Sequence, residues 1–246
     1  MDWTHDGIVL SARKHGETSA IVTLLTREKG RHAGLVRGGA GKRQRGILQP
    51  GNLVHAHWRA RLSEHLGTLT CELGHAHAAA FLHDAPRLAA LSAACAVADG
   101  ALPEREAHPA IFDGLVALLG ALDGPSWTSV YVKWELGVLG ELGYGLDLSC
   151  CAATGSNDNL IYVSPKTGRA VSASAGEPYK KALLALPSFL LAEGIEGGAA
   201  EIFDGLGLTG YFLERHVFAA HDKALPAARR RLAERLAADA GSRPGP

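Results

Sequence analysis

Residues 53–62, LVHAHWRARL, alternate between apolar and polar side chains with a period of two. Strand side chains alternate in this way between the two faces of a sheet, whereas helical side chains repeat every 3.6 residues. The segment therefore predicts a half-buried strand with an apolar inner face and a basic outer face. The inner face would hold Val54, Ala56, Trp58, Ala60 and Leu62, and the outer face His55, His57, Arg59 and Arg61.

Four other short runs rich in β-forming residues surround this segment. GIVLSARKHG, SAIVTLLTREKG and RHAGLVRGG precede it, and GTLTCEL follows it. In the last run, Leu69, Cys71 and Leu73 are expected inward, and Thr68, Thr70 and Glu72 outward. Five short strands with short connections predict a small closed barrel, and the OB-fold is the five-stranded barrel that commonly binds oligonucleotides. Trp58 is expected in the core of the barrel rather than as a platform for stacked bases.

The remainder of the chain has helical periodicity. Three apolar stripes are expected, running from Leu82 to Ala98, from Ile111 to Leu122 and from Trp127 to Leu142, with Ser126 as an N-cap. Further helices are predicted at 177–192, at 207–223 and from Pro226 onward. The fold class is therefore α+β, an N-terminal OB-fold barrel followed by a helical domain. We place the barrel at 1–78, the helical domain at 79–240 and a disordered tail at 241–246.

Residues 146–176 interrupt the helical part. LIYVSPKTGRAVS predicts a β-hairpin that turns at residues 165–168. Cysteines before a hairpin are typical of a zinc ribbon, which needs two CxxC pairs. Cys150 and Cys151 are adjacent, Thr154 stands where a second sulfur is needed, and no cysteine follows the hairpin. The sequence therefore predicts no metal there, and it predicts none at the paired histidines 55/57 and 75/77.

The net charge of zero hides a strong asymmetry. Residues 1–80 hold eleven Lys and Arg against six Asp and Glu, so the rest of the chain holds 14 against 19. Between residues 27 and 61 nine cations face a single acid, Glu28. Segregated positive charge indicates a polyanionic partner for the N-terminal part.

VRGGAGKRQRG, residues 36–46, concentrates this charge, with four glycines and four cations. It is not a Walker loop, because Arg43 follows Gly41-Lys42 where that loop needs Ser or Thr. The dinucleotide pattern GxGxxG also fails, at Gln44. We predict a flexible loop whose Lys42, Arg43 and Arg45 follow a nucleic-acid backbone.

Other classes of protein are weakly supported. No GxSxG, no HExxH and no cluster of carboxylates is present, so we predict no enzyme and no cofactor. No long apolar run and no signal-peptide pattern occurs, so we expect no membrane interaction and a cytoplasmic location. A general OB-fold protein that binds single-stranded nucleic acid remains the alternative.

Several blocks resemble the RecO family of bacterial recombination and repair proteins. They are SAIVTLLTREKGRHAGLVRGG, LQPGNLV, GTLTCEL, ELGYGLDLSCCAATG and YVSPKTGRAVS, in family order over nearly the whole chain. LQPGNLV and LGYGLDLSxC are the most specific. Some members carry four cysteines in a zinc ribbon; only Cys151 matches one of them here, so the chain resembles a member that has lost the metal and kept the hairpin.

The resemblance implies a mediator of DNA repair and homologous recombination. It implies binding of single- and double-stranded DNA, annealing of complementary strands, and work with RecR and often RecF to load RecA on DNA coated by single-strand-binding protein (SSB). It also implies association with the nucleoid during repair and binding of the acidic, apolar tail of SSB by the helical domain. Candidates for that tail are Lys133, Trp134 and Arg215. The expected DNA-binding residues are Arg13, Lys14, Arg27, Lys29, Arg31, Arg37, Lys42, Arg43, Arg45, Arg59 and Arg61.

Overall fold

The computed structural model describes residues 1–192 and 194–241. The chain forms two compact units. The first unit comprises Met1–Gly120 and Pro226–Leu232, and the second comprises Ala121–Leu225 and the chain from Ala233 on. The predicted disordered tail lies outside the described residues, except for Gly241. None of the described helices is both long and apolar enough to cross a lipid bilayer.

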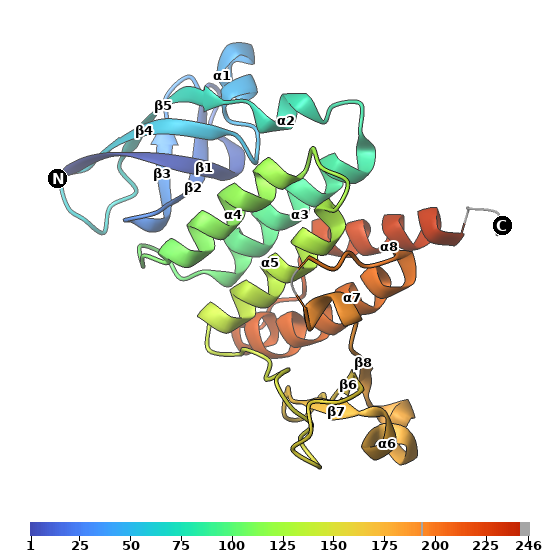
Figure 1. The fold of residues 1–246 in the computed structure, drawn as a ribbon. Coiled ribbons are helices and arrows are strands. Elements are labelled where there is room, and N and C mark those ends of the chain that lie inside the picture. Colours follow the sequence, from blue (N-terminus) through green and yellow to red (C-terminus); the bar gives the residue numbers. More distant parts are fainter. Residues whose placement is uncertain (193, 242–246) are drawn as a thin grey trace. The chain divides into compact units, whose positions relative to one another are not determined.

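The first unit begins with a closed five-stranded barrel, which confirms the predicted fold class (Figure 1). Around the barrel the strand order is β1-β2-β3-β5-β4. β1 pairs with both β2 and β4, and a parallel bridge between Leu35 and Thr68 joins β3 to β5 and closes the ring. The strands are β1 (Asp2–His15), β2 (Ser19–Thr26), β3 (Gly30–Val36), β4 (Leu53–Arg59) and β5 (Thr68–His75).

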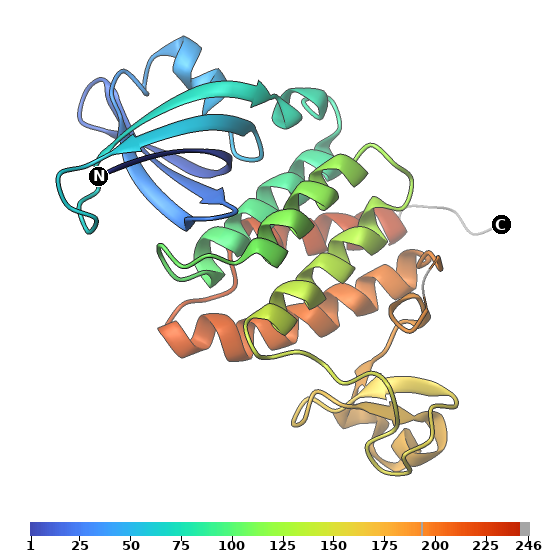
Figure 2. The same ribbon diagram turned by 60° about the vertical axis from the view of Figure 1, so that its left-hand side comes forward.

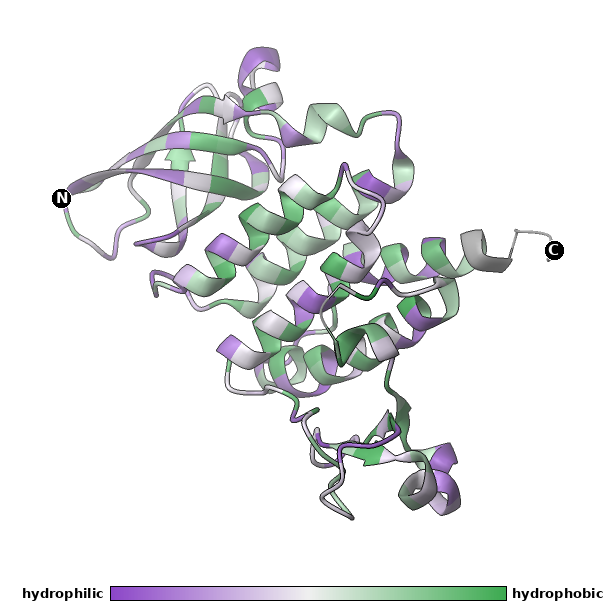
Figure 3. Cartoon of the chain, in the orientation of Figure 1, coloured by the Kyte–Doolittle hydropathy of each residue, from purple (hydrophilic) through white to green (hydrophobic). Residues whose placement is uncertain are grey.

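The alternation of β4 and β5 fills the barrel as predicted over most of their length. Val54, Ala56 and Trp58 are buried, whereas the histidines between them are exposed. Figure 3 shows the same alternation between hydrophilic and hydrophobic residues along the strands. Two predicted core residues are exposed instead. Leu62 follows the end of β4, and Leu73 lies beside the register shift between β4 and β5, so neither is held against the barrel core.

A short helix, α1 (Lys42–Ile47), lies at one end of the barrel in the connection from β3 to β4 (Figure 2). The prediction of an irregular loop is therefore wrong for these six residues. Leu48, which directly follows α1, is 2% exposed and belongs to the barrel core. The side chain of Asn52 donates to the carbonyl oxygens of Gly46 (3.0 Å) and Ile47 (3.1 Å) near the helix C-terminus. Burial of Leu48 and these bonds stabilise a helix despite its glycine-rich surroundings.

Three helices complete the described part of the first unit before residue 121. They are α2 (His77–Ala80), α3 (Ala85–Ala101) and α4 (Pro109–Ala121). Asp84 is the N-cap of α3 and accepts from the backbone N–H of Arg87 at 3.1 Å. Because α3 starts only there, Leu82 precedes the helix and is 66% exposed, contrary to its predicted place in the first stripe. The predicted second stripe is confirmed by α4, in which Ile111, Leu115, Leu118 and Leu119 are buried.

The second unit contains α5 (Trp127–Glu141), a three-stranded sheet and α7 (Ala199–Phe212). Ser126 is the N-cap residue of α5, as predicted, but its hydroxyl donates to Glu196 instead of capping the helix. The predicted hairpin is confirmed as β6 (Leu160–Val163) and β7 (Ala170–Ser172). The sheet order is β7-β6-β8, with β8 at Leu184–Ala185.

The predicted helix at 177–192 is wrong. This segment contains a 3-10 helix at Glu177–Ala182, strand β8 and a second 3-10 helix at Ser188–Leu190, and it follows the four-residue α6 (Ala173–Gly176). Pro187, in the interior of the segment, prevents a continuous helix, because it lacks the N–H that the helix needs there.

Two further helical regions are close to the prediction. α7 starts at Ala199, earlier than predicted, and continues through a π-helical turn at Leu213–Phe218 and a 3-10 turn at Ala219–His221. A Cβ on Gly205 of α7 would lie 2.9 Å from Val132 of α5, so this glycine permits close packing of the two helices. The last helix, α8, spans Ala227–Gly241.

Candidate nucleic-acid interface

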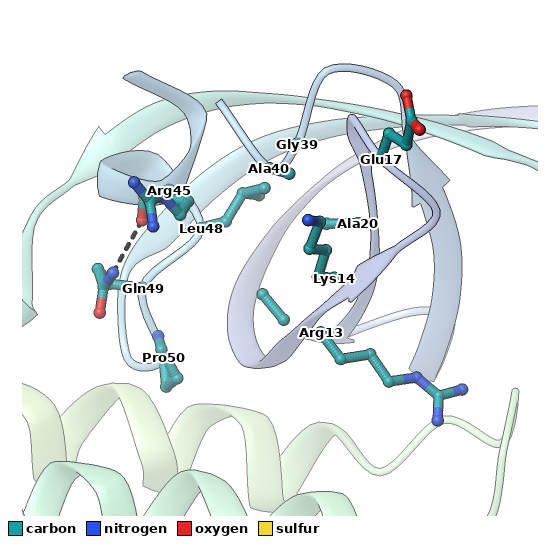
Figure 4. Close-up of a pocket in the computed structure, with 11 residues that line it drawn as sticks. Arg13, Lys14, Glu17, Ala20, Gly39, Ala40, Arg45, Leu48, Gln49 and Pro50 are labelled. Carbon is teal, nitrogen blue, oxygen red and sulfur yellow. Dashed lines mark hydrogen bonds between the residues drawn. The ribbon is translucent and has the colours of Figure 1, made fainter. Parts of the chain in front are cut away.

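A pocket of about 390 Å³ lies between the β1–β2 hairpin and the α1 region (Figure 4). Lys14 and Arg13 line it from β1, and Arg45 lines it from α1. Ala20, Leu48 and Pro50 supply apolar surface. The charge pattern of the sequence indicated these three cations but not the pocket that they share.

The register of the barrel separates the two β1 cations. Lys14 pairs with Ala20, which is buried, so its side chain leaves the strand on the inner side of the barrel. Arg13 pairs with Ile21 and leaves on the outer side. Figure 4 shows this difference, with the ammonium group of Lys14 directed into the pocket and the guanidinium of Arg13 directed away from it.

A second, smaller pocket of about 280 Å³ opens where β3 and β5 diverge beyond their bridge. Arg37, Gln44, Thr68 and Thr70 line it. The Oε1 atom of Gln44 is buried and has no hydrogen-bond partner within the described residues. Arg59 of β4 lies next to Thr68 in the register. The sequence predicted both threonines outward but gave no signal for Gln44.

Six of the eleven predicted DNA-binding residues lie at this end of the barrel. We call them the α1-end cations, and they are Arg13, Lys14, Arg37, Lys42, Arg43 and Arg45. All six are exposed, and within the described part of the chain none forms an ion pair with a carboxylate. Their charges are therefore available to an external anion.

The other five predicted residues form two further groups. Arg59 ends β4 and Arg61 follows it, while Arg27, Lys29 and Arg31 lie at the β2–β3 turn. β2 and β3 are antiparallel, with Gly30 opposite Thr26 and Val36 opposite Ala20, so this turn is at the far end of both strands from Arg37. The structure therefore does not gather all eleven residues on one continuous surface.

Two arginines of that turn contact the protein itself. The guanidinium of Arg27 donates three hydrogen bonds to Asp113, at 3.0, 3.2 and 3.1 Å, and this carboxylate raises the pKa of Arg27. Arg31 donates to the carbonyl oxygen of Leu102 (2.9 Å) and to Asp99 (3.2 Å). A Cβ on Gly30 would lie 1.7 Å from the carbonyl oxygen of Glu106, so the turn packs closely on the α3–α4 connection. Both arginines thus have a structural role in the first unit.

The histidines of the barrel surface contact carboxylates and hydroxyls. His55 bonds Asp6, His5 lies 3.2 Å from Glu28, and His57 lies 3.0 Å from the hydroxyl of Thr4. Acidic partners on this part of the barrel make it less attractive to phosphate than the α1 end. Among the described residues, no group of three or more His, Cys, Asp or Glu is arranged to hold a metal.

The cysteines before the hairpin are surrounded by hydroxyl and amide groups. Sγ of Cys151 accepts the backbone N–H of Ser172 at 3.3 Å. Hydrogen bonds from the side chains of Ser172 and Thr154 lower the pKa of the Cys151 thiol to about 6. Sγ of Cys150 lies 3.8 Å from the guanidinium of Arg169. Two adjacent thiols with two nearby hydroxyls do not supply the tetrahedral thiolate set of a zinc ribbon, so these residues do not fit that metal.

The three candidates for binding an acidic tail lie in the second unit. The ammonium of Lys133 lies 6.0 Å from the ring centre of Phe189, and Arg215 lies 5.9 Å from the ring of Tyr211. Trp134 is only 6% exposed, and its Nε1 has no hydrogen-bond partner within the described residues. Lys133 and Arg215 thus contact different aromatic rings. Leu191, Ile195 and Phe203 expose large apolar side chains in the same unit.

Comparisons with known proteins agree with the architecture. The family model for the N-terminal part of recombination protein O matches residues 1–75, and the model for its C-terminal part matches residues 82–226. The DNA repair protein RecO of Rhodospirillum centenum is 60% identical over 237 residues, which cover 96% of this chain and 94% of that protein. RecO of Rhodospirillum rubrum is 51% identical over 96% of each chain. RecO of Caulobacter vibrioides strain NA1000 is also 51% identical, over 96% of this chain and 98% of its own length. The chain therefore belongs to the RecO family of DNA repair and recombination proteins.

Proposed function

We propose that this chain binds single- and double-stranded DNA through the sugar-phosphate backbone, with the α1 end of the barrel as the main contact surface. The observation that carries the proposal is the set of six exposed α1-end cations without carboxylate partners among the described residues. Each cation that replaces condensed counterions on DNA contributes salt-dependent affinity. Contacts of this kind hold a strand in place without reading its sequence.

The other predicted DNA-binding residues contribute unequally in this proposal. Arg59 and Arg61 extend the surface along β4, and Lys29 adds a further exposed charge at the β2–β3 turn. Arg27 and Arg31 contribute less, because Asp113 and Asp99 already neutralise them. We assign DNA binding to a domain at residues 1–78 and contacts with other proteins to a helical domain at 79–240.

The proposed activity is strand annealing and mediation, and it needs no catalytic residue and no cofactor. Two complementary strands repel each other through their phosphates, and a surface that neutralises both lowers that repulsion. Binding must also stay weak enough for strands to slide and exchange. With RecR, and with RecF in some routes, the protein would promote RecA loading on DNA coated by SSB, in the cytoplasm and at the nucleoid.

The test of this proposal is RecA loading on coated single strands. We expect the purified protein together with RecR to shorten the lag before RecA assembles on SSB-coated DNA, measured by the ATPase activity of RecA. A general single-strand-binding OB-fold protein would bind the same DNA and leave the lag unchanged. An unchanged lag at saturating protein and RecR would contradict the mediator role.

We further propose that the second unit binds the acidic, apolar tail of SSB near Lys133. Leu191 offers exposed apolar surface to such a tail, and Lys133 and Arg215 offer positive charge to its carboxylates. In this proposal Trp134 shapes the site from beneath, since its ring is buried.

Replacement of Lys133 by Glu is expected to weaken tail-peptide binding by about tenfold, because an attractive charge becomes repulsive at the peptide terminus. Fluorescence anisotropy of a labelled tail peptide measures the affinity. Lys181→Glu is the matched control, since Lys181 is an exposed lysine in the same unit and makes the same change in charge. Equal affinity of the Lys133→Glu variant and the wild type would remove Lys133 from the site.

A further inference from the structure

The pocket at the α1 end combines positive charge with apolar walls, and a surface that only contacts phosphates does not need the apolar walls. Ala20, Leu48 and Pro50 give it apolar walls, whereas Lys14 and Arg45 give it positive charge. Its volume of about 390 Å³ falls at the low end of small-molecule sites, in the range of one nucleotide rather than several. Apolar walls suit a sugar and the face of a base, and cations suit a phosphate.

Lys14 is the residue that distinguishes this pocket from the surrounding basic surface. Its cross-strand partner Ala20 is 4% exposed, so the side chain of Lys14 leaves β1 on the inner side of the barrel. Lys14 lies at the end of the barrel where Arg45 of α1 lines the same pocket. In Figure 4 the ammonium group of Lys14 is directed into the pocket. Glu17 also lines the pocket, and its carboxylate is directed away from the ammonium group of Lys14. Neither Lys14 nor Arg45 has a carboxylate partner within residues 1–192 and 194–241.

We propose that this pocket binds a nucleoside phosphomonoester, as found at the phosphorylated end of a DNA strand. An internal phosphodiester carries one negative charge, whereas a phosphomonoester carries roughly 1.5 to 2 near pH 7. Two unpaired cations in a partly apolar pocket favour the more highly charged group. Phosphorylated strand ends would then bind more tightly than strand interiors. The inference rests on the proposed DNA binding and assigns a ligand class to one part of that surface.

The experiment compares short oligothymidylates by fluorescence anisotropy, each labelled at an internal position. One strand carries hydroxyls at both ends, one carries a 5′-phosphate and one carries a 3′-phosphate. A fourth, unmodified strand is one nucleotide longer, so it adds a single internal phosphate. We expect at least one phosphorylated strand to bind about tenfold more tightly than both unmodified strands, the effect of a charge-assisted hydrogen bond.

Two neighbouring residues of β1 supply the variant and its control. Lys14→Gln is expected to abolish the preference for the phosphorylated strand, because its ammonium enters the pocket. Arg13→Gln is expected to lower the affinity for every strand and to keep the preference, because its guanidinium points away. Thermal unfolding of both variants verifies that the barrel remains intact. Preference retained in Lys14→Gln would overturn the assignment.

A competition with thymidine 5′-monophosphate distinguishes a strand end from a free nucleotide as the source of the ligand. If micromolar thymidine 5′-monophosphate abolishes the tighter binding of the phosphorylated strand, the pocket is supported and its ligand is a free nucleotide. If only a large excess of the nucleotide abolishes it, the ligand is a strand end. Equal affinity for all four strands would overturn the inference and leave the proposed DNA binding intact. Absence of binding to every strand would instead refute the proposed function. Titration with thymidine 5′-monophosphate alone would then show whether the pocket binds a nucleotide.

Discussion

Charge reversal at Lys42, Arg43 and Arg45 together is expected to weaken the binding of single-stranded DNA by at least about a hundredfold at low salt. The variant loses three of the six α1-end cations and places three carboxylates where phosphates would lie. All three residues are exposed on α1. The change therefore removes DNA contacts without removing buried side chains, and fluorescence anisotropy with a labelled oligonucleotide measures it.

The control for this variant is a triple substitution in the second unit, at Lys166, Lys181 and Lys223. All three lysines are exposed, and their replacement by Glu changes the net charge by the same amount. We expect this control to bind DNA within about threefold of the wild type, because it keeps all six α1-end cations. Equal losses in both variants would indicate a response to net charge alone and would contradict a localised surface.

Replacement of Trp58 by Ala is expected to lower the free energy of unfolding by about 3 to 5 kcal/mol. Trp58 is 2% exposed in the barrel core, and its Nε1 donates to the carbonyl oxygen of Leu66 at 2.9 Å. It stacks on Trp3 with ring centres 6.0 Å apart and contacts His32 edge-on. The substitution leaves a cavity among these rings, and urea denaturation followed by circular dichroism measures the loss.

The same variant separates a core role for Trp58 from a role in stacking bases. A core residue changes stability and leaves the DNA affinity of the folded fraction unchanged, whereas a stacking platform loses affinity at nearly constant stability. Trp58→Phe keeps an aromatic core residue and is expected to cost less than the alanine substitution. A stable Trp58→Ala protein with weak DNA binding would contradict the core assignment.

The barrel was predictable because strand alternation is a local property of the sequence. Val54, Ala56 and Trp58 are buried as the period-two pattern requires. The pattern failed at Leu62 and Leu73, where burial depends on the strand end and on a register shift between β4 and β5. Those features depend on pairing between strands, which no single segment encodes.

The helices that were mispredicted have non-local causes. α1 is stabilised by burial of Leu48 in the barrel and by the side chain of Asn52, whereas Gly46 within it and the glycines before it favour a loop on local grounds. In the segment 177–192, β8 exists because Ala185 pairs with Tyr162 of β6. Apolar content alone therefore could not distinguish a strand from a helix there.

The sequence predicted that the cations of the candidate site are concentrated in the N-terminal part. It did not predict which of them lie together on one surface of the folded barrel. The partner of Arg27 is 86 residues away in the sequence and that of Arg31 is 68 residues away, so neither ion pair could be foreseen. The opposite orientations of Arg13 and Lys14 follow from strand alternation, but which of the two enters the pocket depends on the pairing of β1 with β2. The resemblance to a known family was enough to identify the family of the chain. The positions of its cations on the surface could be learned only from the folded structure.

The central claim is that the barrel holds DNA by its phosphates and does not read its bases. Its most direct test is the dissociation constant for single strands of different sequence, measured over a range of salt concentrations for the wild type and the triple α1 variant. We predict similar affinities for all sequences and a linear fall of log affinity with log salt, with a slope shallower by about 2 in the variant, since each lost contact contributes about 0.7. Salt-independent binding, or a strong preference for one base sequence, would contradict the account.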